Sequence, residues 1–253
     1  MKVNITIPVY NEEQTLFLCI SKLVTFLENN TRYNYEVIIA DNASTDKTSE
    51  IARSLCRKHH RVKYVRLKEK GRGRALKKAW RLSKADILCY MDADLATDLS
   101  ALPQLISAIK AGYDIAVGSR LIKGSKVKRS VLREILSRSY NFILRTFLGV
   151  KFKDAQCGFK AINRKVLQQI VPKIQDNNWF FDTELLFIAE RMGFKIKEIP
   201  VLWVEEGTLL RNIDANNKKQ LRKSKVQLIK TIFNYLNSIR RLRKKLYVIY
   251  NDE

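Results

Sequence analysis

The sequence has no long apolar run. No uninterrupted apolar window in its 253 residues approaches the roughly 18–20 residues that a transmembrane helix requires. The chain runs almost at once into a strand-like segment, Val3–Val9, so we expect no secretory signal peptide. If this protein meets a membrane, we therefore expect it to lie on the surface and not to span it.

Cysteine and glycine are also scarce. The four cysteines lie far apart and form no Cys-x-x-Cys pair, which favours reduced thiols in a cytosolic compartment. With nine glycines and 46% hydrophobic residues, the composition suits a globular protein and excludes a fibrous or disordered one. A chain of this length can form one large domain, or one domain with an appendage.

Acidic residues are rare in two parts of the chain. Residues 120–153 hold ten lysines or arginines against one acid, and residues 209–253 hold twelve against three. These segments carry most of the net charge of +23, whereas residues 1–119 are much closer to balance. Such a basic surface predicts an anionic partner, which is a nucleic acid, a membrane surface or a phosphorylated ligand.

Strand-like and helix-like segments alternate through the first 120 residues. This alternation predicts an α/β fold with a mostly parallel sheet and helices on both faces. The expected strands are Val3–Val9, Glu36–Ala40, Val62–Leu67, Asp86–Met91, Asp114–Val117, Gly158–Asn163 and Lys195–Val204, the last with an edge or bulge at Pro200. The expected helices are Glu13–Leu27, a segment capped by Ser44–Asp46 and ending near Arg57, Gly71–Ser83 after an opening loop, Leu99–Ala111 and Phe180–Met192.

Two basic amphipathic helices are expected outside this alternation. Between Leu132 and Leu148, apolar residues recur at helical spacing with arginines between them. A second helix, from about Lys218 to Leu246, contains the basic run 240–245. A basic face opposite an apolar stripe suits a membrane interface, which we favour for the C-terminal helix. For the first helix, packing on the sheet with its arginines in solvent is an equal alternative.

The most informative stretch is Asp92-Ala93-Asp94, which directly follows the apolar strand Ile87–Met91. Two carboxylates at this spacing are hard oxygen ligands that can hold Mg²⁺ or Mn²⁺ against a diphosphate. Polar residues also follow the first and second strands, as Tyr10–Glu12 and Asp41–Asn42. Because parallel strands end at one edge of a sheet, all three groups are predicted to line one crevice. A nucleobase or ribose could bind there.

Four motifs occur together in this chain: Pro8-Val9-Tyr10-Asn11-Glu12, Asp92-Ala93-Asp94, Gly118-Ser119-Arg120 and Gln156-Cys157-Gly158-Phe159-Lys160. In these, the chain resembles the A-type glycosyltransferases of the large inverting family, and within it the polyprenyl-phosphate sugar transferases. The resemblance covers about residues 1–210. It implies a Rossmann-like A-type glycosyltransferase fold, with 211–253 as a basic amphipathic helical tail. The narrower stretches 154–160 and 181–186 favour the dolichyl-phosphate glucosyltransferase branch over the mannose synthases.

The resemblance also implies a role for each matching residue. Asp92 and Asp94 become the metal ligands, and Mg²⁺ or Mn²⁺ the cofactor. The implied catalytic residues are Asp94, Arg120 and Asp182. Contacts with the nucleotide sugar are implied for Pro8, Tyr10, Glu12, Asp41, Asn42, Gly71, Asp92 and Ala93. Contacts with the phosphate of the acceptor are implied for Arg120, Arg133 and Ser137.

The acceptor decides which side chains the chemistry needs. A lipid monophosphate brings its own anionic nucleophile, so the site must supply positive charge and in-line geometry more than a general base. The forked guanidinium of arginine suits that task. A glycan hydroxyl would instead need a base, and Asp182 or Glu184 would be that base. The alternative role for both carboxylates is negative charge at a helix N-terminus.

Two positions differ from the family pattern. Ala96 stands where mannose synthases often carry a glutamine that joins the metal shell, and Leu209 stands where many relatives have a lysine that reaches the diphosphate. The identity of the donor and the closing of the late loop are therefore the features that the resemblance determines least.

The sequence thus predicts an enzyme that transfers a hexose, with inversion, from a nucleotide sugar to a polyprenyl or dolichyl phosphate. UDP-glucose is the favoured donor and GDP-mannose the second. We expect a peripheral protein on the cytoplasmic face of a membrane, held by anionic lipid, with a membrane subunit left open as a further partner. A transferase acting on a glycan is the alternative. A nucleic-acid-binding protein is a remote one, because no motif of that class is present.

Overall fold

The computed structural model describes residues 1–30, 33–205 and 234–244. Two compact units divide the chain. The first comprises Met1–Lys128 and Phe152–Val204, and the second comprises Arg129–Lys151 and Glu205–Glu253. The domain boundary predicted at residue 210 lies outside the described residues and stays a prediction.

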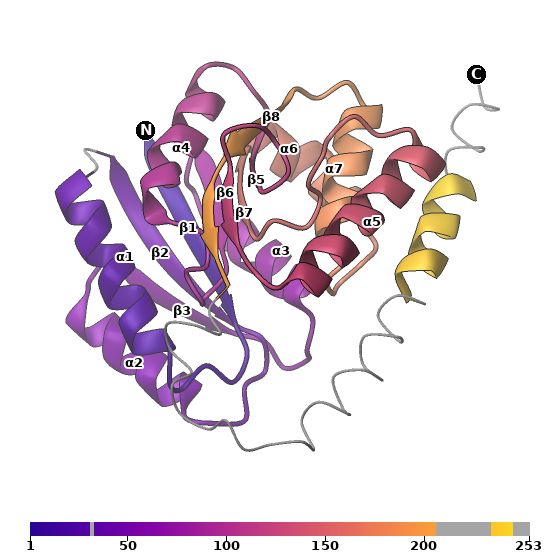
Figure 1. Ribbon diagram of the computed structural model, residues 1–253. Coiled ribbons are helices and arrows are strands. Elements are labelled where there is room, and N and C mark those ends of the chain that lie inside the picture. Colours follow the sequence, from indigo (N-terminus) through magenta and orange to yellow (C-terminus); the bar gives the residue numbers. More distant parts are fainter. Residues whose placement is uncertain (31–32, 206–233, 245–253) are drawn as a thin grey trace. The chain divides into compact units, whose positions relative to one another are not determined.

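Within the described residues, the first unit is built on a seven-stranded sheet (Figure 1). In chain order its strands are β1 (Lys2–Val9), β2 (Asn34–Asp41), β3 (Val62–Arg66), β4 (Ile87–Met91), β5 (Ile115–Ser119), β7 (Phe159–Asn163) and β8 (Ile196–Pro200). Across the sheet they follow the order β3-β2-β1-β4-β7-β5-β8. Strand β7 runs antiparallel to both of its neighbours, and all other pairs are parallel. The predicted mostly parallel sheet is therefore confirmed.

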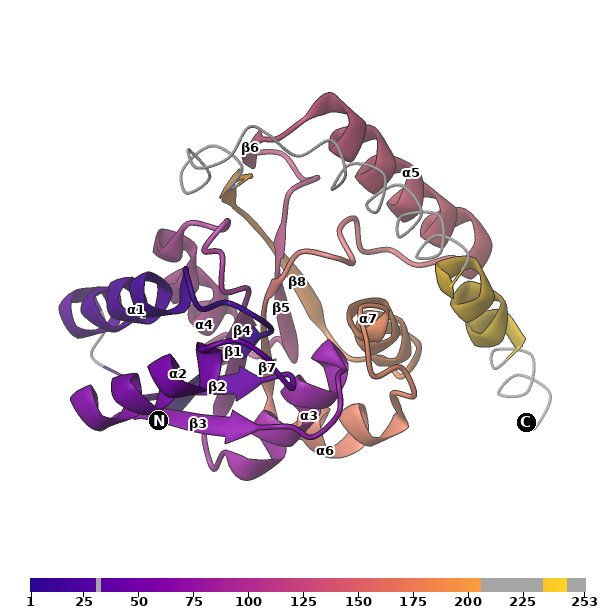
Figure 2. The ribbon, with the colours of Figure 1, turned by 90° about the horizontal axis from the view of Figure 1, so that it is seen from below.

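Helices cover both faces of this sheet, as the alternation predicted (Figure 2). Helices α1 (Leu16–Asn30), α2 (Thr48–Lys58) and α4 (Leu102–Lys110) pack on one face, while α3 (Arg72–Leu82) and α7 (Phe181–Arg191) lie on the other. The remaining elements of this unit are α6 (Arg164–Gln169), the 3₁₀ turns η1 (Leu99–Ala101) and η2 (Val171–Lys173), and a small parallel pair of β6 (Lys126–Lys128) with β9 (Leu202–Val204).

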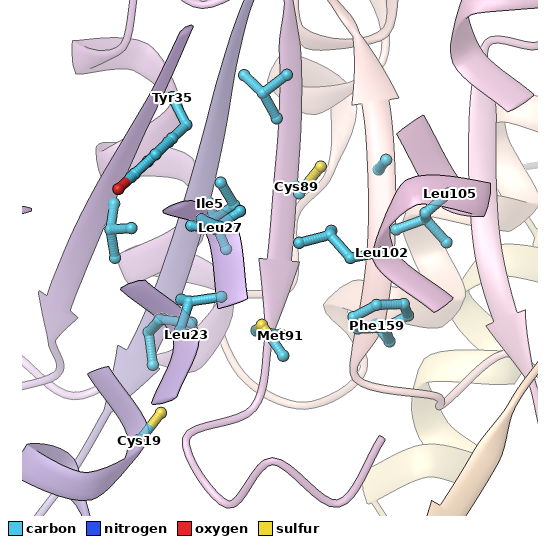
Figure 3. Close-up of a cluster of buried hydrophobic side chains, with 14 of the residues drawn as sticks. Ile5, Cys19, Leu23, Leu27, Tyr35, Cys89, Met91, Leu102, Leu105 and Phe159 are labelled. Carbon is cyan, nitrogen blue, oxygen red and sulfur yellow. The ribbon is translucent and has the colours of Figure 1, made fainter. Parts of the chain in front are cut away.

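The main core fills the space between the sheet and the first of these two helical layers (Figure 3). Ile5 of β1 lies against Leu27 of α1, and Leu102 of α4 contributes to the same buried cluster as Phe159 of β7. Because β1, β4 and β5 are buried almost throughout, burial holds the central strands in place. The loops at their carboxyl ends therefore start from rigid positions.

The structure corrects several predicted boundaries. Lys195–Val204, expected as one strand, forms two: β8 ends at Pro200 on the edge of the sheet, and β9 pairs with β6 instead. Proline cannot donate to a ladder, which explains an end at that position. Helix α1 begins at Leu16, three residues later than expected, and the expected Leu99–Ala111 helix opens as the turn η1. The short elements β6, α6 and η2 were missed because three to six residues show no period.

The second unit contains the predicted amphipathic helix, α5 (Val131–Leu148). It ends at Gly149, whose φ of 60° is the left-handed conformation typical of a helix C-terminus. Residues 234–244 are also helical, and the rings of Tyr140 and Tyr235 lie 5.1 Å apart. The other parts of the helix predicted over 218–246 lie outside the described residues. None of the helices within the described ranges is long and apolar enough to cross a bilayer.

Candidate active site

The loops after β1, β2 and β4 leave the sheet at its carboxyl edge. Each contains one non-glycine residue with a left-handed backbone, namely Asn11 (φ 54°), Ala43 (φ 61°) and Leu95 (φ 51°). Side chains disfavour this conformation, so it persists where the surroundings fix it, often at functional sites. Asn11 is fixed by its own amide, whose Oδ1 accepts a 2.8 Å hydrogen bond from the backbone of Thr45. The sequence-predicted crevice is thus bordered by loops that are held in unusual conformations.

Asp92 and Asp94 lie in the loop after β4. The backbone N–H of Asp92 donates to the carbonyl of Gly158 at 3.1 Å, and the carboxylate of Asp94 accepts from the backbone of Ala96 at 3.1 Å. Burial and the neighbouring Asp92 carboxylate raise the pKa of Asp94. Two like charges are therefore held together at this edge of the sheet.

This pair fits a divalent cation. Carboxylate oxygens are the ligands that Mg²⁺ and Mn²⁺ prefer, and the Asp92 side chain is 39% exposed, so a ligand can reach it. Within the part of the chain that the structure describes, no group of three or more His, Cys, Asp or Glu side chains is placed to hold a metal. A cation bound here could complete its shell with further oxygen ligands, such as water or a donor diphosphate.

The guanidinium of Arg72 joins Asp92 to helix α7. Its Nη2 lies 2.6 Å from Oδ1 of Asp92, and its Nη1 lies 2.6 Å from Oδ2 of Asp182. The aromatic rings of Tyr90 and Trp179 lie 5.0 and 4.9 Å from its central carbon. Burial alone would lower the pKa of Arg72, but the two carboxylates raise it well above its usual value. Arg72 is thus a permanently charged bridge.

Asp182 has both carboxylate oxygens engaged. Its second oxygen, Oδ1, lies 3.0 Å from Nζ of Lys160 and accepts a hydrogen bond from the hydroxyl of Tyr90. Burial would raise the pKa of Asp182, yet the charges of Lys160 and Arg72 hold it below its usual value. The other predicted base, Glu184, is also buried, and it accepts from the backbone of Asp176 at 2.9 Å.

The residues predicted to contact the nucleotide lie on the ends of β1, β2 and α3. Asp41 is fully buried, and its two oxygens accept from the backbone of Ser44 at 2.8 Å and from the hydroxyl of Tyr64 at 2.5 Å. Asn42 accepts from the backbone of Gly71 at 2.5 Å. The structure therefore joins Asn42 to Gly71 and turns Asp41 toward protein donors.

The other predicted nucleotide contacts lie at the ends of β1 and β4. Pro8 is half-buried near the end of β1, and the ring of Tyr10 carries the ammonium of Lys70 at 3.9 Å from its centroid. Glu12 is bound through its backbone to the hydroxyl of Thr48 at 2.8 Å. Ala93 is buried and lies between Asp92 and Asp94 in the chain. No bound nucleotide tests these roles, which stay predictions.

Arg120 forms a bidentate ion pair with Asp154. Its Nε and Nη2 donate to the two carboxylate oxygens at 2.7 and 2.8 Å, and its backbone N–H donates to the same group at 3.0 Å. Its guanidinium also lies over the ring of Trp203, at 5.6 Å. Asp154 is fully buried, so Arg120 has a fixed position. Its predicted contact with an acceptor phosphate stays a prediction.

Arg133 and Ser137 lie on α5, in the second unit. Arg133 is exposed and forms an ion pair of 2.5 Å with Glu205. Ser137 is buried, and its hydroxyl has no hydrogen-bond partner among the described residues. Their predicted contacts with an acceptor phosphate also stay predictions.

Sequence reasoning missed the residues that connect this site, which are Arg72, Tyr90, Asp154, Lys160 and Trp179. A signal was present for Lys160, since a charged residue inside the apolar strand Phe159–Asn163 requires a buried partner. Nothing in the sequence identified Asp182 as that partner.

Known proteins are similar to this chain in both sequence and fold. The profile of glycosyl transferase family 2 matches residues 4–171. The glycosyltransferase AglD of Haloferax volcanii is 37% identical over 213 residues, which are 82% of this chain and 34% of that protein. A dolichyl-phosphate beta-glucosyltransferase of Homo sapiens is 33% identical over 226 residues, 83% of this chain and 69% of that protein. The chain thus spans about a third of the length of AglD.

The fold also occurs among solved structures. Glucosyl-3-phosphoglycerate synthase from Mycobacterium tuberculosis, in complex with Mn²⁺, UDP and glucosyl-3-phosphoglycerate, superposes with a TM-score of 0.63. That match is 18% identical and covers 92% of this chain and 79% of the other. It confirms the predicted Rossmann-like A-type glycosyltransferase fold. With the profile match over most of the sheet, this chain belongs to glycosyl transferase family 2.

Proposed function

We propose that this protein transfers a hexose, with inversion, from a nucleotide sugar to a polyprenyl or dolichyl phosphate. UDP-glucose is the favoured donor and GDP-mannose the second. The name of the human relative, a dolichyl-phosphate beta-glucosyltransferase, supports this class of acceptor. The shared sequence covers 83% of this chain, so it must include the middle of the chain, with the loop after β4 as well as α5.

One observation carries the choice of acceptor. Asp182 receives hydrogen bonds or ion pairs from three partners and has a lowered pKa, which makes it a weak general base. A phosphate oxygen needs no base, because it is already anionic when it attacks the anomeric carbon. The bond from that carbon to the donor diphosphate then breaks, and the nucleoside diphosphate leaves with both electrons. A glycan hydroxyl would depend on a general base, a role for which Asp182 is poorly suited.

The donor side of the site is the edge formed by the loops after β1, β2 and β4. In this proposal Asp92 and Asp94 would hold Mg²⁺ or Mn²⁺, and the bound cation would supply positive charge to the diphosphate of the donor. Asn42, Gly71 and Tyr10 border the nucleoside. The polar groups on these loops are held by hydrogen bonds before any ligand arrives, so little conformational entropy is lost on binding.

The acceptor side needs positive charge. Asp154 uses Nε and Nη2 of Arg120, so Nη1 is the guanidinium edge that would face an acceptor phosphate. Arg133 and Ser137 on α5 are the further candidates, since Arg133 is exposed and Ser137 has a hydroxyl without a described partner.

Helix α5 also supports contact with an anionic membrane. Leu132, Ile135 and Phe142 are 64, 55 and 61% exposed, although large apolar side chains usually avoid water. Arginines lie between them along the helix. An apolar stripe flanked by arginines suits a helix that lies in the headgroup region of a bilayer containing anionic lipid. The proposed location is therefore the cytoplasmic face of a membrane, because that leaflet carries anionic lipid.

A donor screen tests this function. The protein would be incubated with UDP-glucose or GDP-mannose, a short-chain polyprenyl phosphate and Mn²⁺ or Mg²⁺. The mass of the lipid product would then be measured by mass spectrometry. A product heavier by one hexose, lost on chelation and in Asp94→Ala, is expected. If Asp94→Ala turned over normally, the assignment of the donor site would be wrong. Transfer to a free glycan but not to the lipid phosphate would contradict the proposal that a lipid phosphate is the acceptor.

A further inference from the structure

A chain of four alternating charges runs from the middle of the sheet to Asp92, one of the two carboxylates of the candidate cation site. Lys160 lies 3.0 Å from Asp182, Asp182 lies 2.6 Å from Arg72, and Arg72 lies 2.6 Å from Asp92. The first three side chains are nearly excluded from solvent, with 0, 4 and 6% exposed, while Asp92 reaches the surface. The chain therefore connects a buried lysine to an accessible carboxylate.

Such a network is not needed to stabilise a fold. Removing charges from water costs free energy that ion pairing often fails to recover, and apolar side chains of similar size can do as well or better. A guanidinium, however, has a planar fork that can hold two carboxylates in fixed directions at once. The geometry suits a device for orientation, because Arg72 binds Asp92 and Asp182 through different nitrogens.

The backbone around this network brings its two ends close together. Gly73 follows Arg72, and a Cβ at this position would lie 2.7 Å from the Cβ of Phe181, the neighbour of Asp182. The missing side chain lets the start of α3 pack directly on the start of α7. The hydroxyl of Tyr90 also donates to Asp182 from β4. Besides Arg72 on α3, Asp182 is thus held from two strands, by Tyr90 on β4 and by Lys160 on β7.

We propose that Arg72 is a positioning residue for the candidate cation site formed by Asp92 and Asp94. It holds Oδ1 of Asp92, whose Oδ2 packs against Gly158, and so fixes the orientation of the carboxylate that would hold a cation together with Asp94. Asp182 anchors Arg72 from behind, and Lys160 and Tyr90 hold Asp182. This inference rests on the proposed donor site, and it gives Asp182 a role that involves no proton transfer to or from the acceptor.

The sharpest single variant is Arg72→Lys, because it keeps the positive charge and removes the fork. A lysine ammonium cannot donate in both directions with the same fixed geometry. We expect the dissociation constant for Mn²⁺, measured by electron paramagnetic resonance with UDP or GDP present, to rise about 10- to 100-fold. Lys165→Met, which alters an exposed lysine five residues after Lys160, is the control and should leave it unchanged. A folded Arg72→Lys protein with normal Mn²⁺ affinity would overturn the proposal.

Two double variants separate anchoring from proton transfer and from a loss of folding. Lys160→Met with Asp182→Asn removes both charges, yet the amide oxygen can still accept from Arg72. Lys160→Met with Asp182→Leu removes that acceptor as well. We expect Mn²⁺ affinity within about threefold of the native protein for the first and about 10-fold weaker for the second. Equal affinities in the two proteins, with circular dichroism showing both folded, would overturn the anchoring role.

The pH dependence of turnover then tests the absence of a base. The Lys160→Met, Asp182→Asn protein should keep transfer within about tenfold of the native rate, with the same acid limb in its profile. A loss of a thousandfold or more with normal Mn²⁺ affinity would make Asp182 the base and overturn the positioning role. Because Mn²⁺ binding requires no acceptor, a native protein that failed to glycosylate any lipid phosphate would contradict the proposed function alone.

Discussion

Gly158 and the carboxylate of Asp92 occupy adjoining space at the carboxyl edge of the sheet. The Gly158 carbonyl accepts the Asp92 N–H at 3.1 Å, and a Cβ on Gly158 would lie 1.8 Å from Oδ2 of Asp92. No side chain fits at that distance, so the two groups can only coexist if residue 158 is glycine. The same carboxylate is the one that Arg72 holds.

Gly158→Ala should therefore displace Asp92. We expect Mn²⁺ affinity and turnover to fall at least tenfold, with unfolding costing about 1–3 kcal/mol less because the methyl group overpacks the site. Mn²⁺ titration and thermal melts measure the two effects. Gly112→Ala is the control: its φ of 92° strains an alanine, but no atom lies within 4 Å, so stability should fall without any change in Mn²⁺ affinity. Normal Mn²⁺ affinity in Gly158→Ala would contradict this account of Asp92.

The ion pair between Arg120 and Asp154 should matter for stability as well as for the acceptor. Asp154 is fully buried, so Asp154→Asn leaves the guanidinium without its counter-charge and should lower the free energy of unfolding by about 3–5 kcal/mol. Denaturant titration measures this. Glu69→Gln, which breaks the exposed pair of Glu69 with Arg74, should change stability little. Similar small effects in both variants would show that Arg120 is held by other contacts.

Glu36 should make stability depend on pH. Burial alone would raise the pKa of Glu36, but hydrogen bonds from Lys2 and Ser83 lower it to about 2. Because the folded pKa lies below the unfolded one, the stabilisation is present near neutrality and is lost as the pH falls from about 5 towards 2. The shift corresponds to about 3 kcal/mol at pH 7.

Denaturant titrations of Glu36→Gln across this pH range test the assignment. The variant should be less stable than the native protein at pH 7, and the difference should shrink steadily as the pH falls. A difference that stayed constant down to pH 2 would mean that ionisation of Glu36 does not contribute.

The exposed apolar side chains of α5 should control binding to vesicles. Ile135→Ser with Phe142→Ser removes two large apolar groups, each worth about 1.5–3 kcal/mol when transferred from water, so partitioning into anionic vesicles should fall more than tenfold. Added salt should weaken the binding of the native protein, since the arginines contribute through charge. Leu82→Ser changes a similarly exposed leucine on α3 and should have no effect. Equal losses in both proteins would remove α5 as the membrane contact.

Much of the donor side could be predicted from the order of residues along the chain. Apolar runs that end in Asp41 and Asp92 indicate strands, and alternation with helices implies that these strands are parallel. Parallel strands end at the same edge, so the polar residues that follow them had to meet. The family resemblance followed from the same residues, and the comparisons confirm it.

The tertiary structure alone decided how those residues are held. Strand β7 is inserted antiparallel between β4 and β5, and this places Gly158 against Asp92 and Lys160 beside Tyr90. Arg72 and Asp182 are 110 positions apart in the chain, and no local pattern connects them. The sequence by itself thus determined which chemical groups gather at the sheet edge, because strand periodicity is local. Which charges pair there depends on packing between distant elements, and only the folded chain brings those together.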